Sequence, residues 1–218
     1  MGARDDIDAP PLAGGQRVER AERGANQSRI VQDSYLLIKG NSMTDNRLER
    51  IDAEKATDEQ KKVIARLSEG RGRIPTPFNI WLHNPHLAEG MEIIGTHVDH
   101  SPVLSEAESE VVILSTAAFW NAPYVIANHR GHALKSGVPE SVVTAILEKR
   151  RPEAGEGHLG LVCDAVCDIL AGGVIDDARF ARYESELGRA VIAEILITVG
   201  YFTSISLGMS LHALQPKD

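Results

Sequence analysis

The segment 105–121, SEAESEVVILSTAAFWN, most restricts the folds open to this chain. Its first turn is acidic, which suits the positive end of a helix dipole, and Ser105 stands where a helix cap is expected. Beyond that turn the segment is almost entirely apolar, so a helix formed here has no side suited to solvent. We therefore predict a central helix that other elements surround.

The segments around it also show helical spacing. The stretch from Thr57 to Gly70 carries a cap residue at its start, an apolar face and a glycine at its end. Further helices are expected over 85–100, 105–121, 122–137, 139–150, 161–173 and 177–214, the last broken near Gly188, Gly200 or Gly208. No convincing alternating strand pattern is visible. The sequence predicts an all-α domain of about seven or eight helices.

Two segments do not read as regular helices. Residues 71–84 are interrupted by Pro and Gly, but Phe78, Ile80, Trp81 and Leu82 are too apolar for a free loop, so we expect this connector to lie against the core. Residues 1–42 mix Gly, Pro, Asp and Arg with little periodicity, which predicts a flexible extension ahead of a single domain over 43–218. Met43 is a plausible alternative start.

Composition excludes several classes of function. With 218 residues, 43% of them apolar, the chain can bury one substantial core or at most two small ones. The net charge of −8 argues against nucleic acid or an anionic membrane as the main partner, because both need a concentrated basic surface. We find no run of about 18 apolar residues and no secretory signal, so a cytoplasmic protein that does not span a membrane is expected.

Metal, cofactor and disulfide chemistry are not favoured by the sequence. Cys163 and Cys167, one helical turn apart, are expected to be reduced core residues. The histidines gather over 83–100 and at His129 and His132, but a metal site needs three or four converging ligands, and neither cysteine has a histidine beside it in sequence. No glycine-rich phosphate loop is present. We predict neither a metal nor a cofactor.

Two polar side chains on adjacent predicted helices form the strongest candidate site. Glu110 lies where the charged start of one helix gives way to its apolar body, and His129 lies on the next helix. A carboxylate and an imidazole that meet across a helix pair could tune the imidazole for proton transfer near neutral pH. A glutamate near a helix start and a hydrogen-bonded core histidine explain the same residues, so the structural alternative stays open.

The stretch SEVVILSTAAFWNAPYVIANHRGHALKSGVPESVVTAILE resembles the carboxymuconolactone decarboxylase family, which includes the AhpD-like alkylhydroperoxidases. Glu110, His129, Ala133 and Gly137 fall in the positions of that family's glutamate, histidine, small residue and glycine. The resemblance extends over roughly 47–214. It implies an AhpD-like helical fold and a homo-oligomer, either a trimer or a hexamer built from trimers.

Two departures from the family pattern limit the activity that the resemblance implies. The peroxidase branch has a Cys-x-x-Cys where this chain has Ala122 and Val125, so the dithiol mechanism lacks its nucleophile at this site. In the most similar subgroup a Glu-Trp pair follows the tyrosine, whereas Val125 and Ile126 follow Tyr124 here. A second carboxylate beside His129 is therefore missing.

The resemblance implies cofactor-independent proton transfer on a small lactone or carboxylic acid, by decarboxylation or isomerisation. In this hypothesis His129 is the general acid and base and Glu110 orients it, while Tyr124 contacts a substrate oxygen. Trp120, His132 and His83 are candidate substrate-binding residues. The alternatives are a non-catalytic scaffold that binds a small ligand or a protein, and residual peroxidase activity through Cys163 and Cys167.

Overall fold

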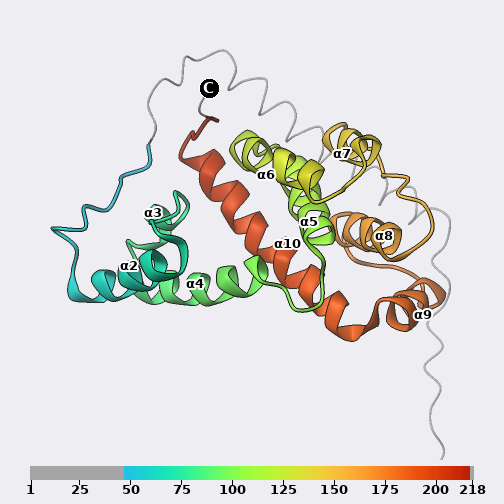
Figure 1. Ribbon diagram of the computed structural model, residues 1–218, viewed down its shortest axis with the longest axis horizontal. Helices are drawn as coiled ribbons and strands as arrows, with labels where there is room; N and C mark the ends of the chain where they lie inside the picture. Colours follow the sequence, from blue (N-terminus) through green and yellow to red (C-terminus); the bar gives the residue numbers. More distant parts are fainter. Residues whose placement is uncertain (1–46, 217–218) are drawn as a thin grey trace, which may run out of the picture. The chain divides into compact units, whose positions relative to one another are not determined.

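The computed structural model describes residues 47–216, and every regular element in that range is a helix (Figure 1). The predicted flexible extension over 1–42 lies outside the described residues. In chain order the helices are α2 (Asp58–Arg71), α3 (Phe78–Trp81), α4 (Pro85–Asp99), α5 (Glu106–Phe119), α6 (Pro123–Lys135), α7 (Glu140–Leu147), α8 (His158–Leu170), α9 (Asp177–Glu186) and α10 (Gly188–Leu211). The all-α prediction is confirmed.

Helix α5 is the centre of the domain, as its apolar sequence predicts. Every residue from Val111 to Ala118 is buried, and α5 packs against α6, α7, α8 and α10. Helix α10 runs through the same core and also contacts α4, α6, α8 and α9 (Figure 1). The two helices therefore fix where the remaining elements can lie.

The helix starts predicted from cap residues are confirmed. The Thr57 hydroxyl accepts from the backbone N–H of Gln60 at 3.2 Å, while the Gln60 side chain accepts from the Thr57 backbone at 2.8 Å. Ser105 and Glu108 form the same reciprocal arrangement at the start of α5. Each arrangement satisfies two backbone donors that a helix start would otherwise leave unpaired.

The long C-terminal helical segment breaks at the first of the three candidate glycines. Gly188, the first residue of α10, adopts φ +81°, a backbone conformation that residues with a side chain rarely adopt. Gly200 and Gly208 lie within α10. A Cβ at Gly208 would come within 2.8 Å of Ile80 Cδ1, so this glycine allows close packing against the connector.

The connector over 71–84 lies against the core, as predicted, with Phe78, Trp81 and Leu82 buried. It contains the short helix α3, which its Pro/Gly content does not predict. On α4, Leu87 is 49% exposed, whereas Ala88, Gly95 and Val98 are buried against the core.

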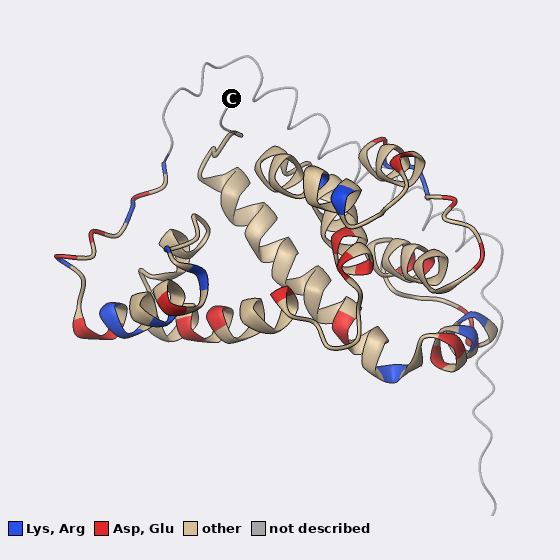
Figure 2. Cartoon of the chain, in the orientation of Figure 1, with Lys and Arg blue, Asp and Glu red and all other residues tan. Residues whose placement is uncertain are grey.

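Helix α10 also has the length and hydropathy of a membrane-spanning helix. Its most apolar window has a mean hydropathy of 1.8, and half of that window is buried within the domain. Arg189 and Glu194 are its only charged residues, so α10 is almost entirely tan in Figure 2. A core helix has the same composition, so the expectation that the protein does not span a membrane stays a prediction.

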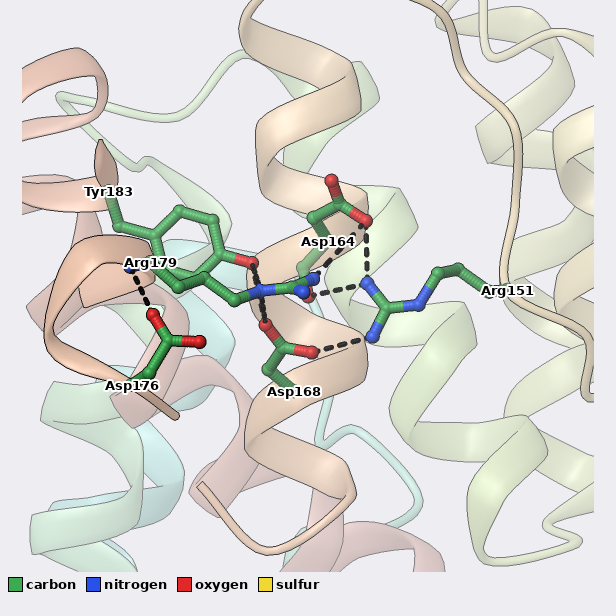
Figure 3. A network of polar contacts seen from close by, with 6 residues as sticks. All are labelled: Arg151, Asp164, Asp168, Asp176, Arg179 and Tyr183. Carbon is green, nitrogen blue, oxygen red and sulfur yellow. Dashed lines mark hydrogen bonds and ion pairs between the residues drawn. The ribbon is translucent and has the colours of Figure 1, made fainter. Parts of the chain in front are cut away.

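A polar network joins α8 and α9 to the segment after α7 (Figure 3). Arg151 contacts Asp164 and Asp168 on α8, with an N···O distance of 2.5 Å in each pair. Asp168 also pairs with Arg179 of α9 at 2.5 Å and accepts from the Tyr183 hydroxyl at 2.7 Å. Asp168 therefore links three segments through one carboxylate.

Because of this network, we expect the free energy of unfolding to depend on pH. Burial raises the pKa of Asp168, but hydrogen bonds from Tyr183 and Arg151 and the charges of Arg151 and Arg179 outweigh it and hold the pKa below its usual range. A depressed pKa adds stability above the unfolded value of about 3.9, and this is lost as the pH falls through the folded value. Asp168→Asn should lower the free energy of unfolding by about 1 kcal/mol at neutral pH.

The difference between Asp168→Asn and the wild type should shrink as the pH falls below about 4. Urea unfolding of both proteins over a series of pH values measures it. A difference that stays constant across that series would contradict the role given to the charged form of Asp168.

Candidate functional site

Glu110 and His129 are in direct contact. Nδ1 of His129 on α6 lies 3.0 Å from Oε2 and 3.3 Å from Oε1 of Glu110 on α5. Both side chains are largely but not fully enclosed, with 25% of His129 and 15% of Glu110 exposed. The tautomer that suits this contact carries the proton on Nδ1, which then donates to the carboxylate.

The turn between α5 and α6 sets this pairing. Asn121 adopts φ +51° between the helices, a conformation that asparagine tolerates better than most residues. The N–H of Ala122 donates to the carbonyl of Ala117 at 2.9 Å, which closes the turn. The edge-on ring of Phe202, 5.2 Å from the His129 ring between centroids, packs against the imidazole.

Nε2 of His129 has no hydrogen-bond partner among residues 47–216. With Nδ1 held by Glu110, this second nitrogen is the one available to exchange a proton with a ligand. Glu110 thus orients His129 as a base, and within residues 47–216 no group binds its reactive atom, Nε2.

Two cavities meet at His129. The first, called the Arg71 cavity, has a volume of about 380 Å³ and is lined by residues of the connector, α6 and α10, among them Arg71, Arg73, Tyr124, Asn128, His129, His132 and Tyr201. The second, called the Lys135 cavity, has a volume of about 750 Å³ and is lined by Glu110, Ser109, Lys135 and the loop after α4. Asp99, His129 and His132 line both. The imidazole is therefore accessible from two sides.

Charged groups surround the first cavity. Arg71 pairs with Asp99 at 2.6 Å, and its Nη2 atom is buried without a hydrogen-bond partner. Burial raises the pKa of Asp99, although the charge of Arg71 opposes this. Burial also raises the pKa of Tyr201 to about 12, so its hydroxyl keeps its proton. Arg71 and Arg73 thus bring positive charge to the wall of this cavity.

The structure brings some of the candidate site residues together and leaves others apart. Tyr124 and His132 line the Arg71 cavity with His129. Trp120 does not line either cavity, and its indole N–H donates to Thr203 Oγ1 at 3.0 Å. His83 is exposed in the turn after α3, outside both cavities. Neither side chain therefore lines a cavity beside His129, and their assignment as substrate-binding residues stays a prediction.

Three residues that line the Arg71 cavity lie outside the sequence motif, so the motif does not predict them. Tyr201 and Phe202 come from α10, more than 70 positions after His129, and Asp99 comes from the end of α4. Only the packing of α10 against α4 and α6 places them here. A pattern search along the chain cannot find such residues, although the lone tyrosine within apolar α10 is a weak clue.

Two other His–Glu pairs show that the contact alone does not define a site. His158 pairs with Glu108, two positions before Glu110 on α5, and His97 pairs with Glu194 at 3.0 Å. Neither histidine lines the Arg71 or the Lys135 cavity. No group of three or more His, Cys, Asp or Glu side chains within residues 47–216 has the geometry to hold a metal ion.

The two cysteines are free thiols in α8. Burial raises the pKa of Cys163 to about 12, and burial also raises that of Cys167. Both therefore stay protonated near neutral pH, and a thiol is a poor nucleophile. This argues against the peroxidase alternative through these residues.

No protein-family model and no curated protein matches this chain. Solved structures, in contrast, do match it. A cysteine-to-alanine variant of the debrominase Bmp8 in complex with 2,3,4-tribromopyrrole aligns with a TM-score of 0.60 at 12% identity, over 80% of this chain and 93% of the other. The apo form of Bmp8 aligns with the same score and identity over 81% and 93%. The likeness supports the helical fold, and these neighbours are enzymes.

Proposed function

We propose that the protein is a cofactor-independent enzyme of the carboxymuconolactone decarboxylase type, acting on a small lactone or carboxylic acid by proton transfer at His129. The observation that carries the proposal is the Glu110–His129 contact, because it orients an imidazole whose Nε2 is left free beside two cavities. An oriented imidazole of this kind is suited to general acid and base catalysis.

The cavity suits a small anionic substrate. Its volume of about 380 Å³ is at the lower end of the range for ligand pockets. Arg71 and Arg73 supply positive charge in an otherwise acidic protein, and the buried Nη2 of Arg71 has no protein partner. The complex of the structural neighbour with 2,3,4-tribromopyrrole supports a small ring compound as ligand of this fold.

The proposed decarboxylation requires the transfer of one proton to the substrate. When the carboxylate leaves as carbon dioxide, its bonding electron pair stays on the substrate and is delocalised onto the lactone carbonyl as an enolate. Protonated His129 then donates its Nε2 proton to the ring carbon next to the lactone carbonyl, where the enolate carries its charge, and water restores the proton on Nε2 and leaves as hydroxide. Glu110 stabilises the charged imidazole during this cycle, and the Tyr124 hydroxyl contacts the substrate oxygen.

The test is release of carbon dioxide from γ-carboxymuconolactone by the purified protein. We expect turnover without added metal or cofactor, and binding of the lactone with perturbation of the His129 resonances in NMR. Binding without turnover would favour the non-catalytic scaffold. Failure to bind this lactone or other small lactone acids would overturn the proposed substrate class.

Arg73 is exposed at the cavity, and we predict that it steers the anionic substrate. Arg73→Gln should raise KM about tenfold with little change in kcat, since a charge-assisted contact to the carboxylate is lost in ground and transition state alike. Steady-state kinetics measures this. Arg189→Gln, which removes an exposed arginine paired with Glu184 outside the cavity, should leave both constants unchanged.

A further inference from the structure

A third cavity lies away from His129. It has a volume of about 240 Å³, is formed where the ends of α5, α7 and α8 approach one another, and shares no lining residue with the other two. We call it the Lys149 cavity. Most of its wall is apolar, with Phe119, Ile146 and Leu170 contributing the largest apolar side chains. The proposed reaction makes no use of it.

Lys149 is held at this cavity in an unfavourable backbone conformation. It has φ +57° just after α7, where its N–H donates to Ile146 and that of Arg150 donates to Ala145 at 2.8 Å. Glycine is the usual residue in this helix ending, and Gly137 fills the equivalent place after α6 with φ +96°. A lysine here costs free energy that glycine would avoid, and such strain is concentrated at functional positions.

Lys149, Arg150 and Arg151 line this cavity, and among them Lys149 is the residue without a carboxylate partner in residues 47–216. Arg150 donates to Glu148 at 2.9 Å, and Arg151 is held by the aspartates of α8 (Figure 3). The Lys149 ammonium has no ion-pair partner within the described part of the chain, residues 47–216. Lys149 is exposed overall, but the protein around its ammonium lowers its pKa by burial, and no counter-charge opposes this.

A second polar group of the cavity is left unsatisfied. Ser115 is 7% exposed, and its hydroxyl has no hydrogen-bond partner, although the neighbouring Thr116 hydroxyl donates to the carbonyl of Val112 at 2.8 Å. Buried hydroxyl groups in folded proteins are normally paired. The wall of the Lys149 cavity therefore includes one buried hydroxyl that the protein leaves unpaired.

We propose that the Lys149 cavity binds a small carboxylic acid with an apolar body, its carboxylate at the Lys149 ammonium and its hydrocarbon against Phe119, Ile146 and Leu170. The carboxylate provides the counter-charge that the protein leaves out, and the apolar body matches the wall. A neutral apolar molecule would leave the ammonium desolvated without a partner. A longer polar ligand would leave its own groups unpaired against the apolar wall.

The test uses octanoate as the probe, with the full chain and isothermal titration calorimetry. Octanoate should bind, 1-octanol at least tenfold more weakly, and the octanoate affinity should fall as salt is added. Lys149→Met, which keeps the apolar stem, should weaken octanoate binding about tenfold or more. Lys135→Met, which removes a lysine from a different cavity, should leave octanoate binding unchanged.

A second variant separates binding from folding. Lys149→Gly should weaken octanoate binding as Lys149→Met does, yet should not lower the melting temperature, because glycine adopts the positive φ without strain. Equal affinity for octanoate and 1-octanol, unchanged affinity in both Lys149 variants, or no binding at millimolar octanoate would each overturn the proposal.

Discussion

His129→Gln is expected to lower kcat by about 10² to 10⁴, the usual range for loss of a general acid or base. The amide keeps much of the shape of the imidazole but cannot exchange a proton near neutral pH. Because 25% of the His129 side chain is exposed, the domain should keep its fold. Turnover of the lactone acid and the thermal melting curve, measured on the same preparation, check both parts.

The chain offers a matched control for this variant. His158→Gln removes the other histidine that pairs with a glutamate in the first turns of α5, but that histidine lies outside the Arg71 and Lys135 cavities. It should leave kcat within about twofold, since no catalytic contact is lost. If the two variants lose turnover equally, or if His129→Gln loses only thermal stability, the Glu110–His129 pair is structural.

Gly95→Ala is expected to lower the free energy of unfolding by about 1–3 kcal/mol, the range for an overpacked core. A Cβ at Gly95 on α4 would lie 2.3 Å from the hydroxyl oxygen of Tyr201 and 3.1 Å from Nη2 of Arg71. The Tyr201 ring cannot retreat easily, because it packs against Trp81 and Phe202. Both displaced side chains line the Arg71 cavity, so turnover should also fall about tenfold through misplacement of the site.

Gly90→Ala is the control on the same helix. A Cβ there would have no atom within 4 Å, so the substitution should raise the free energy of unfolding by about 0.5–1 kcal/mol through helix propensity alone. Urea unfolding and turnover of both variants separate the two effects. Similar changes in both variants would mean that the close approach of Tyr201 to α4 does not limit this site.

Local sequence chemistry predicts much of the fold and rather less of the site. Thr57 and Ser105 mark helix starts because capping depends on residues within one turn. The contact of Glu110 with His129 could also be anticipated, because a short turn joins their helices. These predictions succeed because each depends on segments that are close together in the sequence.

The remaining site residues depend on contacts between distant segments. Tyr201 and Asp99 enter the Arg71 cavity through the packing of α10 and α4, and the direction of Trp120 is fixed by Thr203 of α10. The orientation of Leu87 and the helix in the connector likewise follow from tertiary packing rather than propensity. The family resemblance itself stays a prediction, because the structural likeness bears on the fold alone.

The position of α10 has a consequence for how the chain folds during synthesis. The buried side chains form two clusters, and α10 contributes to both: Val191 and Ile195 to one, Phe202 and Met209 to the other. Neither cluster can close before α10 has left the ribosome, although α5 emerges about 80 residues earlier. Until then α5 exposes an apolar surface to the cell. Nascent chains stalled before α10 should therefore bind chaperones and be sensitive to proteases, whereas chains with α10 emerged should resist both.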